Sequence, residues 1–227
     1  MQEVLETWLP HLVGRLPEFY KSIWDTLAML VWSGVLVFIL GVFFGMMLTV
    51  TKRDGILPNE WVYQIIDKAV NVFRSIPFII LLTALLPLTR LISGTAIGVQ
   101  GAIVPLVFGT VPFFTRQVET ALAEVDRGVI EAAEAAGLSP LGIIFRVYLK
   151  ESIPAMARVS TITAINLLGL TTMAGVVGAG GLGDFAIRYG HNRFQVDMTA
   201  VTVAVMILIV CVIQITGSLI VKKSTHK

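Results

Sequence analysis

The residue types that carry out chemistry are few in this chain and lie far apart. The three histidines, His11, His191 and His226, show none of the spacings with which proteins hold a metal ion. The chain contains no recognisable nucleophile–base pair and no P-loop of the GxxxxGKS or GxxxxGKT form. The sequence therefore predicts no catalytic or metal site, and it predicts that the chain cannot hydrolyse ATP by itself.

One glycine-rich stretch matches a cofactor-binding pattern. Gly178, Gly180, Gly181 and Gly183 fall in a GxGxxG run. The dinucleotide fingerprint needs a preceding strand and a following helix, whereas this stretch follows a long apolar run, so we reject the nucleotide interpretation. Two alternatives stay open: a flexible turn, or an outer loop whose glycines let the chain bend and move beside a path through the protein.

The composition indicates the environment in which the chain folds. Hydrophobic residues make up 56% of the 227 residues and charged residues 14%, whereas a soluble domain averages about 25% charged residues. That shortage of charge excludes a soluble enzyme, a disordered chain and a nucleic-acid binder. The net charge of +2 implies no broad basic patch, and the single Cys211 excludes an intrachain disulfide framework. The chain is predicted to be an integral membrane protein.

Uncharged stretches predict the helices that cross the membrane. A crossing helix needs about 20 mostly apolar residues, and four uncharged stretches exceed that length. A fifth, Ser75 to Thr89, is shorter and becomes a crossing if it begins near Ala69 with Arg74 extended toward the headgroups. The runs lack the strict alternation of barrel strands. We expect an all-α protein with five spans, at about 25–51, 69–89, 96–122, 152–177 and 196–221, within a permease domain of residues 24–221.

The distribution of cations predicts the orientation. Of the 17 Lys and Arg residues, one side of the membrane would hold only Arg15, Lys21, Arg90, Arg188 and Arg193. The positive-inside rule then places the N-terminus outside and the C-terminus, with the tail 222–227, in the cytoplasm. Residues 1–23 lack the features of a cleavable signal peptide and are expected to form an interfacial amphipathic extension.

The longest polar segment carries its own helix signals. Asp126 can cap a helix start, and Gly137 can end that helix in a left-handed conformation. Ser139 followed by Pro140 is a second start signal. An apolar stripe then follows at helical spacing, Leu141, Ile144, Phe145 and Tyr148. Residues 126–151 are therefore expected to form two short helices that meet at a bend on the cytoplasmic side.

The fourth span carries a polar stripe. Thr163, Asn166, Leu170 and Met173 fall on one helical face. Because an asparagine in hydrocarbon is costly unless it is paired or faces a cavity, we predict that this face lines a path at a dimer interface, with Leu170 and Met173 as an apolar gate. Ordinary hydrogen bonding between helices is the alternative for Asn166.

Two smaller patterns occur in the first and third spans. Arg116 and Glu119 are spaced to form a pair, although extension of Arg116 toward the headgroups is the favoured interpretation. Gly41 and Gly45 form a GxxxG pattern, as do Gly94 and Gly98, and close helix packing is the expected result.

The polar segment resembles a known family. Glu131, Ala132 and Ala133, followed by Gly137 and then Val147 and Leu149, are similar to the EAA loop of ABC importer permeases. The family pattern ends in Leu-Pro, whereas this chain has Lys150 after Leu149. The resemblance implies coupling helices that dock in a groove of the ATPase, with these contact residues: Glu131, Ala132, Ala133, Gly137, Ser139, Pro140, Leu141 and Phe145.

Three further stretches resemble the methionine branch of that family. They are the runs 71–82 (NVFRSIPFIILL), 98–106 (GVQGAIVPL) and 24–29 (WDTLAM). The resemblance implies a type I importer core in a bacterial cytoplasmic membrane, a permease homodimer, two ATPase subunits that bind ATP and magnesium, and an extracytoplasmic methionine-binding protein. L- and D-methionine would then cross by alternating access, and this chain itself would hold no cofactor and bind lipid but no nucleic acid.

Three rivals remain at this point. The chain could be an ABC permease for another amino acid or small nutrient. It could be a membrane scaffold or receptor without transport, which need not bind an ATPase. A secondary transporter is disfavoured because the few charges lie mostly near the ends of the spans rather than at the midplane.

Overall fold

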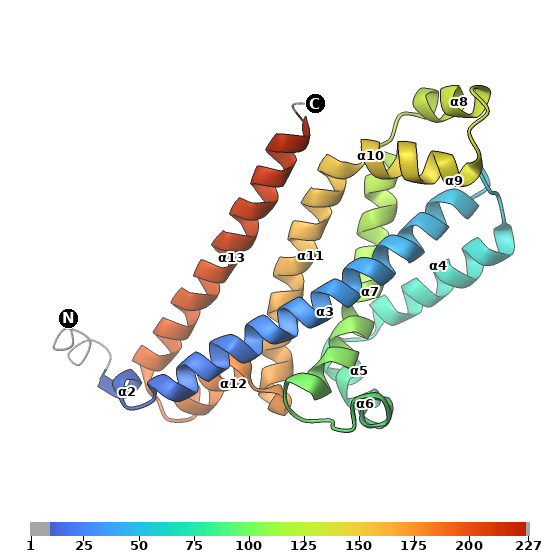
Figure 1. Cartoon of the computed structure of the whole chain (residues 1–227). Helices are drawn as coiled ribbons and strands as arrows, with labels where there is room; N and C mark the ends of the chain where they lie inside the picture. The colour runs from blue at the N-terminus through green and yellow to red at the C-terminus, as the bar shows by residue number, and fades with distance from the viewer. Residues whose placement is uncertain (1–9, 226–227) are drawn as a thin grey trace. The chain divides into compact units, whose positions relative to one another are not determined.

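The computed structural model describes residues 10–225, which form helices and connecting turns (Figure 1). Their Cα positions divide into two compact units. Unit 1 contains residues 10–35, 77–108 and 164–213, and unit 2 contains residues 36–76, 109–163 and 214–225. Each unit is described by itself below.

Four helices are long and apolar enough to cross a membrane. They are α3 (Leu16–Thr51), α7 (Gly98–Ala123), the run Ile153–Ala179, which comprises α11 (Ile153–Ala174) and the π-helical turn η2 (Gly175–Ala179), and α13 (Val196–Thr225). The hydropathy of their most apolar windows lies between 1.4 and 2.7. Four of the five expected spans therefore coincide with long helices.

The fifth expected span, 69–89, is not one helix. Its residues belong to α4 (Glu60–Ser75), α5 (Phe78–Ala84) and α6 (Leu86–Ser93). Ile76 ends α4 in an extended conformation with ψ of 122°, because a residue that precedes proline, here Pro77, is disfavoured in the helical region. The apolar residues of this segment predicted one continuous span, but Pro77 interrupts the helix.

The chain before the first span is helical further toward the N-terminus than expected. A short helix α2 (Pro10–Val13) precedes α3, which begins at Leu16 instead of near residue 25. The proposed extension 1–23 thus includes the first turns of α3, and its residues 1–9 lie outside the described part of the chain. An interfacial role for residues 10–23 stays a prediction.

Unit 1 has two apolar clusters. In one, Phe185 from α12 (Gly181–Phe185) packs between Phe19 and Tyr189, with ring centroids 5.1 and 5.0 Å apart. In the other, Met29 and Leu106 are fully buried. Between helices in a membrane, close packing of such side chains stabilises the unit through van der Waals contacts and favourable ring geometry.

Unit 2 is held together by close helix crossings. A Cβ on Gly41 would lie 2.4 Å from the Phe114 ring, and one on Gly45 would lie 2.5 Å from Val118. The predicted close packing of this GxxxG pair is confirmed. The second GxxxG pair, Gly94 and Gly98, belongs to unit 1 and does not show the predicted close packing. Both residues have positive φ, and no atom lies within 4 Å of a Cβ built on either, so these glycines shape the turn between α6 and α7.

Candidate functional site

The first helix of the polar segment is α8 (Arg127–Ala135), and its start is capped as expected. The Asp126 carboxylate accepts a hydrogen bond from the Gly128 N–H at 2.6 Å. None of the residues of α8 is buried, so Glu131, Ala132 and Ala133 lie on a helix that presents most of its surface outward. Because its side chains are small and its surface is exposed, another protein can approach this helix closely.

A left-handed glycine produces the bend after α8. Gly137 has φ of +78°, and its N–H donates to the Glu134 carbonyl at 2.9 Å. The Leu138 N–H donates to the Ala133 carbonyl at 3.1 Å. These two bonds form a Schellman motif, the arrangement in which a glycine after the last helical residue satisfies the terminal carbonyls. The predicted helix end at Gly137 is confirmed.

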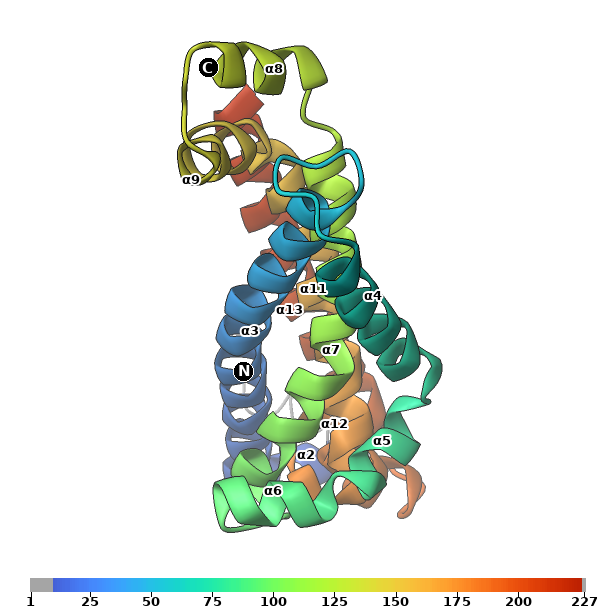
Figure 2. The same ribbon diagram turned by 90° about the vertical axis from the view of Figure 1, so that its right-hand side faces the viewer.

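The second helix starts at Ser139 and Pro140, as predicted. The Ser139 hydroxyl accepts from the Gly142 N–H at 3.2 Å, and Pro140 occupies the first helical position. The helix runs through α9 (Pro140–Ile143), the π-helical turn η1 (Ile144–Tyr148) and α10 (Leu149–Glu151). Figure 2 shows α8 and α9 side by side, joined by the bend at one end.

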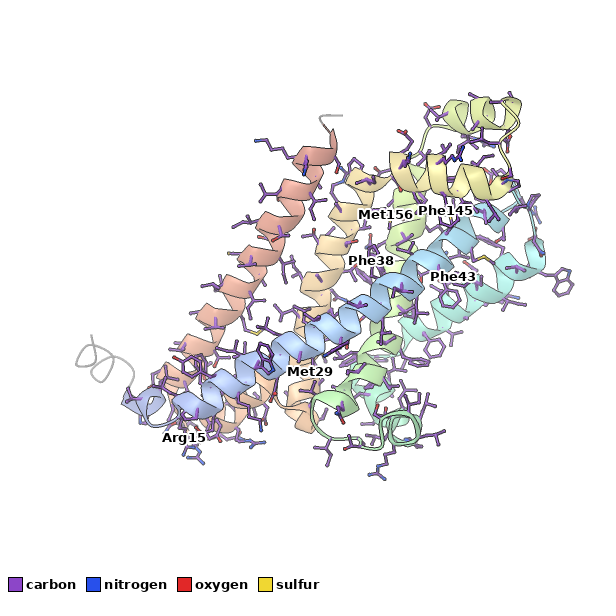
Figure 3. The ribbon with its side chains drawn as sticks, in the orientation of Figure 1. Arg15, Met29, Phe38, Phe43, Phe145 and Met156 are labelled. Atoms are coloured by element: carbon purple, nitrogen blue, oxygen red, sulfur yellow. The ribbon has the colours of Figure 1, made fainter. Side chains whose placement is uncertain are left out.

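The apolar stripe of this second helix is not buried as one face. Tyr148 is buried, but Leu141 and Phe145 are 65% and 63% exposed. The buried residues are Ile143, Val147 and Tyr148, so the buried side of this helix differs from the predicted stripe in all but Tyr148. Leu141 and Phe145, one turn apart, remain as an exposed apolar pair on this helix, and Figure 3 shows where Phe145 lies on it.

An ion chain that sequence reasoning missed attaches α8 to the loop after α3. The Asp54 carboxylate lies 3.6 Å from the Lys52 amine and 3.3 Å from the Arg127 guanidinium. These residues, with Tyr148, line a cavity of about 290 Å³ in unit 2. Burial raises the pKa of the Tyr148 phenol, and the Asp54 carboxylate adds to the increase. Asp54 and Arg127 lie far apart in the sequence, so no sequence pattern indicates that they are in contact.

A second charge cluster replaces the expected extension of Arg116. Its guanidinium donates to the Glu119 carboxylate at 2.7 Å, to the Asp67 carboxylate and to the Asn71 amide oxygen at 3.1 Å. The Arg116 side chain is only 19% exposed. The favoured interpretation of Arg116 as a headgroup contact was wrong, because two acidic partners are available beside it within unit 2.

The residues of the proposed path separate into two groups along α11. Thr163 is buried in unit 2, and its hydroxyl donates to the Val159 carbonyl at 2.8 Å. In unit 1, Asn166 is exposed and Met173 is 40% exposed, whereas Leu170 packs partly against the cluster of Met29. The structure therefore brings Asn166 and Met173 to one open face, and it does not place Thr163 with them.

The glycine-rich segment forms a turn that leads into α12 and packs against neighbouring residues of unit 1. Gly178, Gly180 and Gly181 have φ of +98°, +80° and +81°, and α12 starts at Gly181. The Leu182 N–H donates to the Thr26 hydroxyl at 2.8 Å, and a Cβ on Gly183 would lie 2.3 Å from the Thr172 carbonyl oxygen. Gly181 and Gly183 thus permit close contact with neighbouring helices of unit 1, and the role of this segment as an outer loop beside the path stays a prediction.

Comparison with known proteins gives consistent matches over most of the chain. A family model described as binding-protein-dependent transport system inner membrane component matches residues 38–225. The protein named probable D-methionine transport system permease protein MetI of Vibrio cholerae is 44% identical over 204 residues, 90% of this chain and 91% of that protein. The methionine import system permease protein MetP of Bacillus subtilis is 44% identical, covering 77% of this chain and 78% of that protein.

Solved structures agree with these relatives. A chain of the MetNI methionine ABC transporter in an inward-facing conformation matches with a TM-score of 0.90 and 41% identity, over 93% of this chain and 98% of that chain. A chain of an amino acid ABC transporter solved with histidines matches with a TM-score of 0.77 at 14% identity, a likeness of fold alone.

Proposed function

This chain belongs to the family of binding-protein-dependent transport system inner membrane components, and on that basis we propose that it is the membrane-spanning permease subunit of an ATP-driven importer of L- and D-methionine. The substrate is supported by the names of relatives that are 44% identical over most of the chain. The bent helix pair α8–α9, with its exposed Leu141 and Phe145, carries the proposal in the structure. A pair of exposed apolar residues on a cytoplasmic helix calls for a protein partner.

The proposed partner at this pair is an ABC ATPase. Two such subunits, each with its own ATP and magnesium, would bind a homodimer of this chain, and an extracytoplasmic methionine-binding protein would deliver the substrate. The chain contains no P-loop, so the energy for transport must come from the partner. We place the protein in a bacterial inner membrane with the N-terminus outside and the C-terminus in the cytoplasm.

The backbone provides a direct mechanical route from the helix pair into the membrane. Only Ser152 separates α10 from α11. Two backbone hydrogen bonds bridge this residue: the Ser152 N–H donates to the Tyr148 carbonyl at 3.1 Å, and the Met156 N–H donates to the Ser152 carbonyl at 2.7 Å. This short bridged connection supports the proposal that movement of the second short helix reaches α11, the helix that carries Asn166 and Met173. Alternating access by movement of rigid bodies needs such a connection.

The open face of α11 supplies the proposed path. A polar Asn166 and a flexible Met173 on one exposed face suit a channel that a partner copy completes, and we assign Leu170 and Thr163 only a supporting position beside it.

Labelling of residue 173 tests this path. With Cys211 replaced by serine, a cysteine at position 173 is expected to react with a small hydrophilic thiol reagent in either the nucleotide-free or the ATP-bound complex. Met198→Cys is the matched control, because Met198 is fully buried and should not react. A cysteine at 173 that stays unreactive in both states removes Met173 from the path.

Reconstitution tests the function as a whole. The permease, co-expressed with an ABC ATPase of the methionine importer family and purified, is expected to form a complex that takes up labelled methionine into proteoliposomes in an ATP-dependent manner, with competition by unlabelled L- and D-methionine. Competition by histidine or glutamate instead would assign the permease to another amino acid. Absence of a complex with any ATPase would support a scaffold.

A further inference from the structure

The turn between η3 (Ala186–His191) and α13 presents an aromatic side chain in an unusual state. Phe194 is 90% exposed, and its φ of +56° makes it the single described non-glycine residue with positive φ. This left-handed conformation is unfavourable for a bulky side chain, and exposure of a phenyl ring to water adds a second cost. Such a residue indicates a contact that the isolated chain does not contain.

The turn around Phe194 is fixed by hydrogen bonds and close packing. The Phe194 N–H donates to the His191 carbonyl at 3.2 Å, and the Gln195 N–H donates to the Gly190 carbonyl at 2.9 Å. A Cβ on Gly190 would lie 2.2 Å from the Thr199 hydroxyl, so the turn lies tightly against the first residues of α13. The backbone of Phe194 is consequently held in a fixed position relative to the start of that helix.

Cations surround the turn. The Arg193 guanidinium carbon lies 5.3 Å from the Tyr189 ring centroid, and that of Arg15 lies 4.5 Å from the same ring. Arg188 pairs with Asp184 at 3.0 Å while remaining 59% exposed. Three of the five cations assigned to this side of the membrane therefore gather within one corner of unit 1.

The chain position of Phe194 identifies what it contacts. The uncharged run of α13 extends from Met198 to Val221 and is bounded by Asp197 and Lys222. At about 1.5 Å per residue this run is about 36 Å long, which is enough to cross a hydrocarbon core of about 30 Å. Phe194 precedes the run by four residues, so it lies near the boundary between the acyl chains and the phospholipid headgroups. Phenylalanine occurs on surfaces that insert at that boundary, and arginine is suited to bind the lipid phosphate.

We propose that the turn 192–195 is a membrane-interface anchor, in which the Phe194 ring inserts at the boundary between headgroups and acyl chains and Arg193, assisted by Arg188, binds a phospholipid phosphate. The exposed Trp24 of α3 belongs to the same unit, and because tryptophan is enriched at membrane interfaces it supports the assignment. The anchor fixes the level of α13 in the bilayer. It depends on the membrane location of the chain and not on the transported substrate.

Spin-label depth measurements in nanodiscs of phosphatidylethanolamine and phosphatidylglycerol test the anchor. The native Cys211, exposed on α13, provides a reference inside the hydrocarbon. In a Cys211→Ser background, a label at Phe194→Cys is expected to be more accessible to oxygen than to the aqueous nickel relaxant, at a depth between that of Cys211 and that of the matched control Asn192→Cys. Adding Arg193→Gln is expected to move the label at 194 toward water.

Two results would overturn the anchor. A label at 194 that is as accessible to the nickel relaxant as the label at 192 would place the turn in water. A label at 194 that is protected from both oxygen and nickel would show that protein, rather than lipid, covers this position of the turn.

Discussion

Replacement of Gly137 by valine is expected to reduce ATP-dependent methionine uptake at least tenfold while the permease still inserts into the membrane at its normal level. The φ of +78° at this position is disfavoured for residues with a Cβ, by about 1–2 kcal/mol, and β-branching makes it worse. No atom lies within 4 Å of a Cβ built on Gly137, so the effect comes from the backbone and not from a clash. If the bend leaves the left-handed conformation, the Schellman bonds break and the two short helices change their relative direction.

The matched control is Gly137→Asn. Asparagine adopts the left-handed conformation more readily than other residues with side chains, so uptake within about threefold of the original protein is expected. ATPase activity measured in the same proteoliposomes distinguishes lost coupling from lost assembly. Normal uptake by the valine variant would contradict a coupling role for the bend, and equal loss in both variants would point to a partner surface pressed against position 137.

Replacement of Arg116 by methionine is expected to lower the free energy of unfolding by about 3 kcal/mol, a larger loss of stability than we expect from the exposed ion pairs. Methionine keeps most of the side-chain volume but leaves the carboxylates of Asp67 and Glu119 together without their cation, at 28% and 22% exposure. The value lies at the lower end for a buried ion pair because Arg116 itself retains some exposure. SDS-induced unfolding in mixed micelles measures the change.

Two comparisons test the reason for that loss. The triple variant Arg116→Met, Asp67→Asn, Glu119→Gln removes the unpaired charges and is expected to recover more than half of the lost stability. Arg158→Met serves as the control, because Arg158 pairs with Glu124 at 2.9 Å in an exposed position, and its loss should cost less than about 1 kcal/mol. Equal costs at positions 116 and 158 would show that the Arg116 cluster is well solvated.

Features that depend on neighbours along the chain could be predicted from the sequence. Asp126, Gly137 and Ser139 each interact with backbone groups two to three residues away, so residue type alone was informative. Pro77 is also evident in the sequence, but the apolar residues on both sides of it predict a single span. The helix nevertheless ends there, because proline disfavours the helical conformation at Ile76.

Features that depend on distant packing could not be predicted. Arg116 and Asp67 are 49 residues apart in the chain, and nothing in either segment indicates the other. Leu141 and Phe145 are exposed while Ile143 and Val147 are buried, and the helical spacing of the apolar residues does not show which of them the rest of the unit covers. The resemblance to a permease family therefore predicted the location of the helix pair better than it predicted which of its side chains remain exposed.

The break at Pro77 distinguishes one passage of the chain between its two units from the others. The division between the units crosses the chain five times within the described residues, and four of these crossings fall inside the helices α3, α7, α11 and α13. The fifth falls between Ile76 and Pro77, where α4 has ended and the backbone is extended. Four of the five passages therefore continue a helix from one unit into the other, whereas the passage at Pro77 ends one helix and begins the next.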